Sequence, residues 1–237
     1  IQRSRGLGDV YKRQACNLAR LTHAPDITLI YESGTIGTAP DTLPLSIGDG
    51  ELCDTAMTTV SVPEMFRYWL QGGHITIGFL GAAQIDRFGN INTTVIGDYD
   101  RPKTRLPGGG GAPEIASFSQ KVFVTMKQSR RGMVDKIDFF TSFGHGEGGD
   151  HRRRMGLSTA GPAALITDLA VWKPDEESGE LTVTSLHPGV SRDMVRDSCG
   201  WPVAFAEKVG ETAPPTEVEL DVLRGLKART AAAHAAG

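Results

Sequence analysis

Residues 61–80, SVPEMFRYWLQGGHITIGFL, contain the signals of a helix followed at once by a strand. Pro63 fits the first turn of a helix, and Glu64 suits the positive end of the helix dipole. The pattern predicts a helix through residues 65–70 that ends at the two glycines of residues 72–73. Residues 74–80 (HITIGFL) then read as a strand. A helix that gives way so quickly to a strand is typical of α/β proteins.

The same alternation extends in both directions along the chain. A helix is predicted to end at Leu21, and a capping box of Thr216 and Glu219 is predicted to open a C-terminal one. Short strands with few polar residues are predicted between them, at residues 27–31, 91–96, 121–126, 137–141, 163–167, 170–172 and 180–186. We therefore predict an α/β fold with an open, mostly parallel or mixed sheet and helices on both faces.

Composition restricts the class of protein. The chain has 237 residues, of which 39% are hydrophobic and 22% charged, and its net charge is −3. These values suit a globular domain and argue against a nucleic-acid or membrane partner. The three cysteines are widely spaced and form no C-x-x-C pair. Such usage favours a reducing compartment, and we predict a cytoplasmic protein without a structural metal.

The ends of the sequence differ from its middle. Residues 1–14 (IQRSRGLGDVYKRQ) are polar and basic and show no clear period. We interpret them as a non-native or disordered leader on an N-terminally truncated domain, the alternative being the first turn of a native helix. Residues 15–230 are predicted to form a single domain, and residues 231–237 a frayed tail.

Two other motifs in the chain are weak. Residues 156–160 (GLSTA) approach a serine-hydrolase elbow but end in alanine and follow no clear strand. The stretch HGEGGDHRRR, residues 145–154, contains histidines and carboxylates, but its arginines would oppose a metal cation. We interpret this stretch as a solvated loop or an anion contact.

Two features point to chemistry. In ITLIYESG, residues 27–34, the predicted strand delivers Glu32 to a small residue and a glycine. A carboxylate held there could act as a nucleophile, although Glu also suits the solvent edge of any strand. Residues 108–113 (GGGGAP) offer backbone N–H groups that could bind an oxyanion, or they could be a flexible linker.

Longer blocks carry a resemblance to a known family. These blocks are ITLIYESG, GFLGAAQIDRFGNINTTVIGDYDRPKTRLPGGGGAPEIASFS, SRRGMVDKIDFFTS and TSLHPGVSRDMV. In their order and spacing they resemble the β subunit of family I coenzyme A transferases of the glutaconate CoA-transferase type. The resemblance extends from about residue 15 to residue 225, and the long middle block is its most specific part.

The resemblance implies a ping-pong reaction. Coenzyme A, a co-substrate and not a permanent cofactor, would move from an acyl-CoA to a small carboxylic or dicarboxylic acid through a glutamyl-CoA thioester on Glu32. The backbone of Gly110, Gly111 and Ala112 would form the oxyanion and CoA loop. Residues that could shape the site are Ser33, Gly34, Gln84 and Asn90. For Gln84 and Asn90 the alternative is core or turn hydrogen bonding.

The family also implies a partner. An α subunit would complete the enzyme as a heterotetramer or a larger assembly. Two alternatives stay open: an acyl-CoA or ring-cleaving hydrolase on the same fold, and a non-catalytic subunit. The sequence does not identify the donor, the acceptor acid or the stoichiometry.

Overall fold

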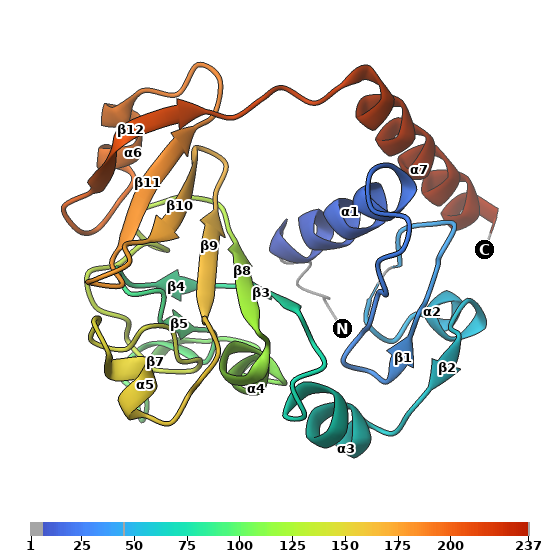
Figure 1. The fold of residues 1–237 in the computed structure, drawn as a ribbon, viewed down its shortest axis with the longest axis horizontal. Helices are drawn as coiled ribbons and strands as arrows, with labels where there is room; N and C mark the ends of the chain where they lie inside the picture. Colours follow the sequence, from blue (N-terminus) through green and yellow to red (C-terminus); the bar gives the residue numbers. More distant parts are fainter. Residues whose placement is uncertain (1–6, 45, 237) are drawn as a thin grey trace. The chain divides into compact units, whose positions relative to one another are not determined.

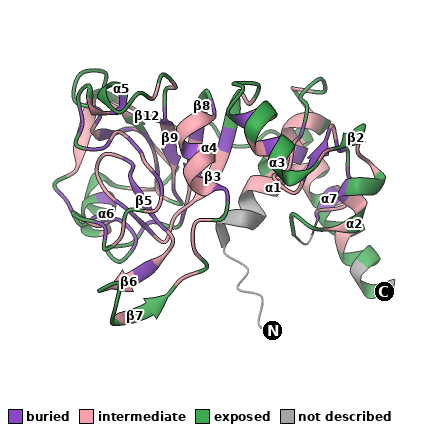
Figure 2. Cartoon of the chain, turned by 90° about the horizontal axis from the view of Figure 1, so that it is seen from below, coloured by how far each residue is buried: buried purple, intermediate pink, exposed green. Residues whose placement is uncertain are grey.

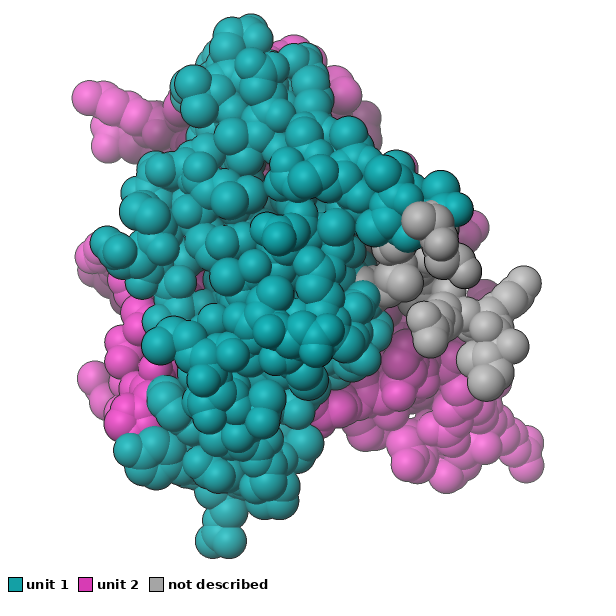
Figure 3. Space-filling model, turned by 90° about the vertical axis from the view of Figure 1, so that its right-hand side faces the viewer, with its two compact units in different colours: residues 1–69, 213–237 teal, residues 70–212 magenta. Residues whose placement is uncertain are grey.

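The computed structural model of the protein describes residues 7–44 and 46–236 (Figure 1). The chain divides into two compact units, which Figure 3 draws in different colours. Unit 1 contains residues 1–69 and 213–237, and unit 2 contains residues 70–212.

Unit 1 is mainly helical. Its elements are α1 (Leu7–Leu21), β1 (Thr35–Ile36), α2 (Gly50–Asp54), β2 (Thr58–Thr59), α3 (Val62–Glu64) and α7 (Glu217–Ala236). A π-helical segment, Met65–Leu70, follows α3 directly. The helix predicted from residue 61 is confirmed, and the Ser61 side chain caps it by accepting from the N–H of Glu64. Helix α1 packs against α7 (Figure 1).

The two terminal helices hold the loop that follows β1. Arg20 of α1 donates to the carbonyl of Pro40 (3.0 Å), and Thr230 of α7 accepts from the N–H of Leu43 (2.8 Å). The predicted capping box of α7 is confirmed, because Thr216 and Glu219 exchange hydrogen bonds of 2.7 and 3.2 Å. Helix α1 runs without a break across the predicted leader boundary after residue 14, and α7 remains helical through Ala236.

Unit 2 is built on a six-stranded mixed sheet. Its strands lie in the order β12 (Ala204–Glu211), β11 (Leu181–Leu186), β10 (Ala170–Pro174), β9 (Pro162–Ile166), β8 (Lys121–Thr125) and β3 (Ile77–Gly81). Strands β3, β8 and β9 are parallel neighbours, as are β11 and β12, whereas β10 is antiparallel to both strands beside it. The predicted α/β class and mixed sheet are confirmed.

Shorter elements complete unit 2. Two small hairpins are formed by β4 (Gln84–Ile85) with β5 (Ile91–Asn92), and by β6 (Val95–Gly97) with β7 (Pro102–Arg105). The helices are α4 (Ala112–Phe118), α5 (His151–Arg154) and α6 (Arg192–Asp197). Most of β7 is exposed, as Figure 2 shows. Strand β8 alternates between buried and less buried residues.

One continuous core fixes the sheet. Trp172 of β10 is fully buried, and it packs in the same cluster as Val122 of β8 and Val183 of β11. Helices α4 and α6 contribute Ala116 and Val195 to this cluster. Both helices therefore cover the core through their small or branched apolar residues, which allow a close approach to the strands.

Two predicted strands are absent and one is divided. Residues 27–31 form only an isolated bridge, Ile30 with Ile36, because the chain turns back immediately. Residues 137–141 are irregular, since the N–H of Asp138 donates to the Gln84 side chain instead of a strand. The predicted strand 91–96 is interrupted because the Asn92 side chain accepts two main-chain N–H groups that follow it, at 2.9 and 3.3 Å.

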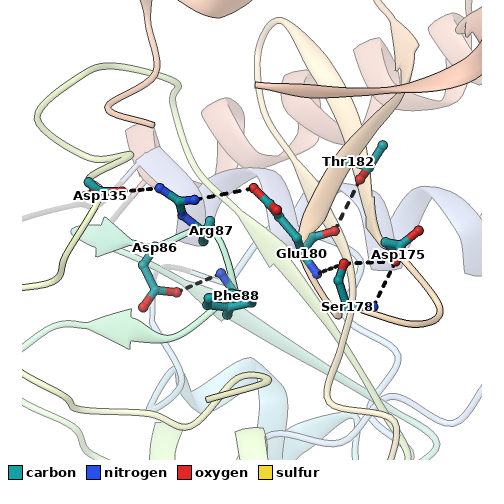
Figure 4. Close-up of polar contacts among 8 residues, drawn as sticks. All are labelled: Asp86, Arg87, Phe88, Asp135, Asp175, Ser178, Glu180 and Thr182. Atoms are coloured by element: carbon teal, nitrogen blue, oxygen red, sulfur yellow. Dashed lines mark hydrogen bonds and ion pairs between the residues drawn. The ribbon is translucent and has the colours of Figure 1, made fainter. Parts of the chain in front are cut away.

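Strands β10 and β11 form a hairpin, and Figure 4 shows its turn. The carboxylate of Asp175 accepts the N–H and hydroxyl of Ser178 at 2.9 and 2.8 Å. Beside it, Arg87 forms ion pairs with Asp135 and, at 3.9 Å, with Glu180 (Figure 4). Arg87 thus connects the β4–β5 hairpin to the β10–β11 hairpin.

A buried arginine joins helix α4 to two loops of unit 2. Arg152 is only 5% exposed, and its guanidinium donates to the carbonyls of Ala116 (2.8 Å), Gly144 (2.9 Å) and Thr159 (2.9 Å). Burial lowers the pKa of Arg152 to about 10. Interpreting residues 145–154 as a solvated loop is therefore wrong for Arg152, whose buried charge is stabilised by carbonyl dipoles, including one from the last turn of α4.

Replacing Arg152 tests this role. Arg152→Met should lower the free energy of unfolding by roughly 2–3 kcal/mol, because several buried carbonyls lose a charged donor. Arg153→Met is the matched control, since the Arg153 side chain is 83% exposed, and it should change stability by less than about 0.5 kcal/mol. Urea-induced unfolding measures both; equal stabilities of the two variants would contradict the role.

Candidate functional site

The segment around Glu32 is a tight turn. The N–H of Gly34 donates to the carbonyl of Tyr31 (3.0 Å), and the N–H of Tyr31 donates to the carbonyl of Thr35 (3.0 Å). Glu32 and Ser33 are therefore the two central residues of the turn, and Glu32 is half-buried. The predicted strand before Glu32 is absent, but the predicted turn that carries the carboxylate is present.

Only glycine fits the last position of this turn. Gly34 has φ +110°, and a Cβ built on it would lie 2.2 Å from the carbonyl oxygen of Val60. The same neighbour returns a hydrogen bond, because the N–H of Val60 donates to the carbonyl of Gly34 (2.9 Å). The E-S-G turn is thereby locked against the segment that follows β2.

Helix α1 anchors the other end of the turn through Tyr31. Asn17, which is fully buried, lies beside the Tyr31 phenol, and its amide donates to the carbonyl of Arg13 (3.0 Å). Burial, with a smaller effect of Cys16, raises the pKa of Tyr31 to about 12, so the phenol stays neutral. Asn17 was not among the residues predicted to matter; a polar side chain among the apolar residues of CNLARL, residues 16–21, was the available signal.

Two hydroxyl groups next to Glu32 lack partners. Within residues 7–44 and 46–236, the oxygen atoms Ser33 Oγ and Thr35 Oγ1 are buried without a hydrogen bond. Buried hydroxyls are usually satisfied, and each exception calls for an explanation, which can be a catalytic role. Ser33, a predicted site-shaping residue, therefore has hydrogen-bonding capacity that the described residues do not use.

The glycine loop lies between β7 and α4 in unit 2. Gly108 and Gly110 have φ values of +99° and +52°, in the region that favours glycine. The N–H of Ala112 donates to the carbonyl of Gly109 (2.9 Å), which closes a turn. In the described part of the chain, no loop or turn carbonyl accepts the N–H groups of Gly110 and Gly111. The loop is an ordered turn in which Gly110 is exposed and Gly111 is buried.

Gln84 and Asn90 serve the framework of unit 2. Asn90 is 1% exposed; its Oδ1 accepts the N–H groups of Gly144 (2.9 Å) and Gly146 (3.0 Å), and its Nδ2 donates to Asp86 (2.8 Å). Gln84 Nε2 donates to Asp138 (2.9 Å). Both side chains make core and turn hydrogen bonds, which was the alternative to a site-shaping role.

The charged residues before the glycine loop either stabilise the β6–β7 hairpin or are exposed. Asp98 Oδ1 accepts the N–H groups of Asp100 and Arg101 (2.9 Å each) and so shapes the tip of the β6–β7 hairpin. Lys103 and Arg101 are exposed. Arg105 lies over the ring of Tyr99, 4.6 Å from its centroid, and steadies the hairpin from outside.

The histidines and carboxylates of residues 145–151 bond within the protein. His145 Nε2 lies 3.1 Å from the carbonyl of Pro162, and His151 Nδ1 accepts the N–H of Glu147 (3.0 Å). Burial lowers the pKa of His145. In the part of the chain that the structure describes, no group of three His, Cys, Asp or Glu residues is arranged to hold a metal ion. Over the same residues, no helix has the length and apolar character to cross a bilayer.

Comparison with known proteins identifies the family. Residues 11–198 match the family model described as coenzyme A transferase. The chain belongs to this family. Its predicted membership, and the transferase class that goes with it, are thus confirmed.

Individual relatives agree with this assignment. The chain is 65% identical to one subunit of the 3-oxoadipate CoA-transferase of Pseudomonas knackmussii, over 93% of its own length and 85% of that protein. It is 34% identical to the corresponding subunit of the glutaconate CoA-transferase of Acidaminococcus fermentans, over 86% and 79% of the two chains. The crystal structure of glutaconate CoA-transferase from the same organism superposes with a TM-score of 0.83 at 31% identity, covering 89% of this chain and 82% of that one.

The geometry of Gly34 yields a direct test. Gly34→Ala should lower the free energy of unfolding by about 1–3 kcal/mol, because the new methyl group meets Val60 and alanine disfavours this φ. Gly50→Ala is the matched control in the same unit, since nothing lies within 4 Å of a Cβ at Gly50. Urea-induced unfolding compares them, and an unchanged Gly34→Ala would argue against the locked turn.

Proposed function

We propose that this chain is the β subunit of a two-subunit CoA-transferase that transfers coenzyme A from an acyl-CoA donor to 3-oxoadipate. The observation that carries the proposal is Glu32 in a glycine-locked turn, in a chain of this family that is 65% identical to a subunit of a 3-oxoadipate CoA-transferase. The relatives named above are each one subunit of an enzyme, which supports an α subunit as the partner.

Glu32 is the nucleophile in this proposal. A carboxylate oxygen attacks the thioester carbonyl carbon of the donor. The C–S bond then breaks, the CoA thiolate departs, and Glu32 carries an acyl-glutamyl anhydride. The thiolate then attacks the Glu32 carbonyl carbon and releases the donor acid as a carboxylate. The enzyme now carries a glutamyl-CoA thioester, and no proton has been gained or lost.

The second half-reaction reverses these steps with the acceptor. A carboxylate of 3-oxoadipate attacks the glutamyl thioester and expels the thiolate, which gives a second anhydride. The thiolate then attacks the 3-oxoadipyl carbonyl carbon, so that 3-oxoadipyl-CoA leaves and Glu32 returns as a carboxylate. Each addition passes through a tetrahedral oxyanion, which needs donors that are already in position.

Several features of the described residues suit these demands. Glu32 is half-buried, which removes part of the hydration that makes a carboxylate a weak nucleophile. The N–H groups of Gly110 and Gly111 would serve as oxyanion donors; one such donor is typically worth ~3 kcal/mol of barrier. The N–H of Ala112 already bonds Gly109, so Ala112 would shape the loop without donating. The hydroxyl of Ser33 could bond the substrate beside Glu32.

The nucleophile can be trapped. With an acyl-CoA and no acceptor, the assembled enzyme should accumulate the glutamyl-CoA thioester, since the second half-reaction cannot proceed. Borohydride should then inactivate it, and peptide mapping should place the changed mass on Glu32. Glu32→Ala should abolish transfer, and Glu32→Asp should lower kcat by about 100-fold because the carboxylate is withdrawn by roughly 1 Å. Glu64→Ala, at an exposed acid of unit 1, should keep full activity; a label on another residue would refute the mechanism.

Substrate and partner are tested together. This chain should be inactive alone and active after co-expression with the α subunit. Mass spectrometry of acyl-CoA products should give higher kcat/KM with 3-oxoadipate than with adipate or glutaconate, because the relative with 65% identity is a transferase for the 3-oxo acid. Turnover by the single chain would contradict the two-subunit proposal. Release of free CoA without any acceptor would indicate hydrolysis in place of transfer.

A further inference from the structure

We infer that Thr93 and Thr141 are positioning residues that hold the glycine loop, residues 108–111, in the conformation required for oxyanion binding. This inference rests on the proposed function, since it assigns a purpose to the loop. It concerns unit 2 alone, and all the contacts that support it lie within that unit.

Thr93 bonds both polar groups of the first loop residue. The N–H of Gly108 donates to the carbonyl of Thr93 (2.9 Å), and the hydroxyl of Thr93 donates to the carbonyl of Gly108 (2.9 Å). Gly108 has φ +99°, and a glycine can take many other conformations once these bonds are lost. Without the Thr93 hydroxyl, the hydrogen bond from the N–H of Gly108 would remain, but the carbonyl of Gly108 would lose its hydrogen-bond donor.

Thr141 supports Thr93 from the opposite side. Its hydroxyl oxygen accepts the N–H of Thr93 (3.0 Å) and lies 2.7 Å from the hydroxyl of Thr94. Its methyl group lies 3.4 Å from the position that a Cβ on Gly109 would take. Thr141 therefore fixes the residue that clamps Gly108, and its methyl group borders the space where a side chain on Gly109 would lie.

The clamp is connected to a buried polar framework. Asn92 is fully buried; its Oδ1 accepts the N–H of Thr94 (2.9 Å), and its Nδ2 donates to Gln84 (2.7 Å) and to the carbonyl of Val95 (2.7 Å). Such a satisfied network in the interior is rigid, because any displacement would leave a buried polar group unpaired. The position of Thr93 is thus defined by the core of unit 2.

The loop has little other support. No heavy atom outside the neighbouring residues lies within 4 Å of a Cβ built on Gly108 or Gly110, within the described part of the chain. The space that a side chain would fill is therefore open at both residues, and the hydrogen bonds of the loop restrain its backbone. On the helix side, the carbonyl of Gly111 accepts the N–H of Ile115 (3.0 Å). The loop is fixed at its end by α4 and at its start by Thr93.

The test uses the assembled two-subunit enzyme with an acyl-CoA and 3-oxoadipate. Variants Thr93→Val, Thr93→Ser, Thr141→Val and Thr141→Ser are compared with Thr104→Val. Thr104 is the matched control, because it is exposed on β7 just before the loop. For each variant, kcat, KM for both substrates, the thermal midpoint and the rate of borohydride-trapped glutamyl-CoA formation are measured.

Misplacing the donors should act on the transition state and not on substrate binding. Thr93→Val should lower kcat and the rate of thioester formation by about 10- to 100-fold, with KM nearly unchanged. Thr93→Ser keeps the hydroxyl and should restore most of the lost kcat. Thr141→Val and Thr141→Ser should repeat this contrast more weakly, and Thr104→Val should behave as the wild type.

Three outcomes would overturn the inference: a wild-type kcat in Thr93→Val, a loss confined to KM, or serine variants as slow as valine variants. If Thr93→Val fails to assemble, the contrast between Thr141→Val and Thr141→Ser decides. Glu32→Ala, measured in parallel, distinguishes a failure of the proposed function from a failure of the proposed role of Thr93 and Thr141. An active Glu32→Ala refutes the proposed function, whereas an inactive one with a normal Thr93→Val refutes only the role of the clamp.

Discussion

The approach of the Val60 carbonyl to Gly34 is the constraint on which the turn around Glu32 depends. At 2.2 Å from a built Cβ, it leaves no room for a side chain, and the φ of +110° disfavours one in any case. Together with the Tyr31–Gly34 hydrogen bond of 3.0 Å, this contact gives Glu32 one backbone position. The anchoring of Tyr31 by Asn17 extends that constraint into helix α1.

Unit 2 reaches similar rigidity by other means. Its loops are held by buried polar side chains that bond the main chain, most clearly Arg152, Asn90 and Asn92. Each of these groups would be costly to bury alone, and each is instead surrounded by carbonyl, carboxylate or amide partners. The result is a set of irregular segments whose conformations are defined without strand pairing. Residues 137–141 are an example, because their side-chain and main-chain bonds replace the ladder that their sequence suggests.

The proposed chemistry uses both kinds of support. A nucleophilic carboxylate needs a fixed, partly dehydrated position, which the glycine-locked turn gives Glu32. Oxyanion donors need N–H groups that are not already bonded, a role proposed for Gly110 and Gly111 of the glycine loop. Both requirements concern backbone geometry more than side-chain identity. Loops on a rigid framework satisfy them, and this arrangement is common for catalytic groups.

The sequence by itself determined the family, the α/β class, the capping of the helices that begin near Ser61 and Thr216, and the two glycine-bearing segments. These features depend on local signals: residue order, periodicity, and the small set of residues that suit caps and turns. Only the tertiary structure decided that residues 27–31 form a single bridge and that Asn92 divides the strand after it. It alone brought Asn17 to Tyr31, Thr141 to Thr93 and Arg152 to the carbonyl of Ala116. Those partners are separated along the chain, and a hydrogen bond between them leaves no periodic trace in the sequence.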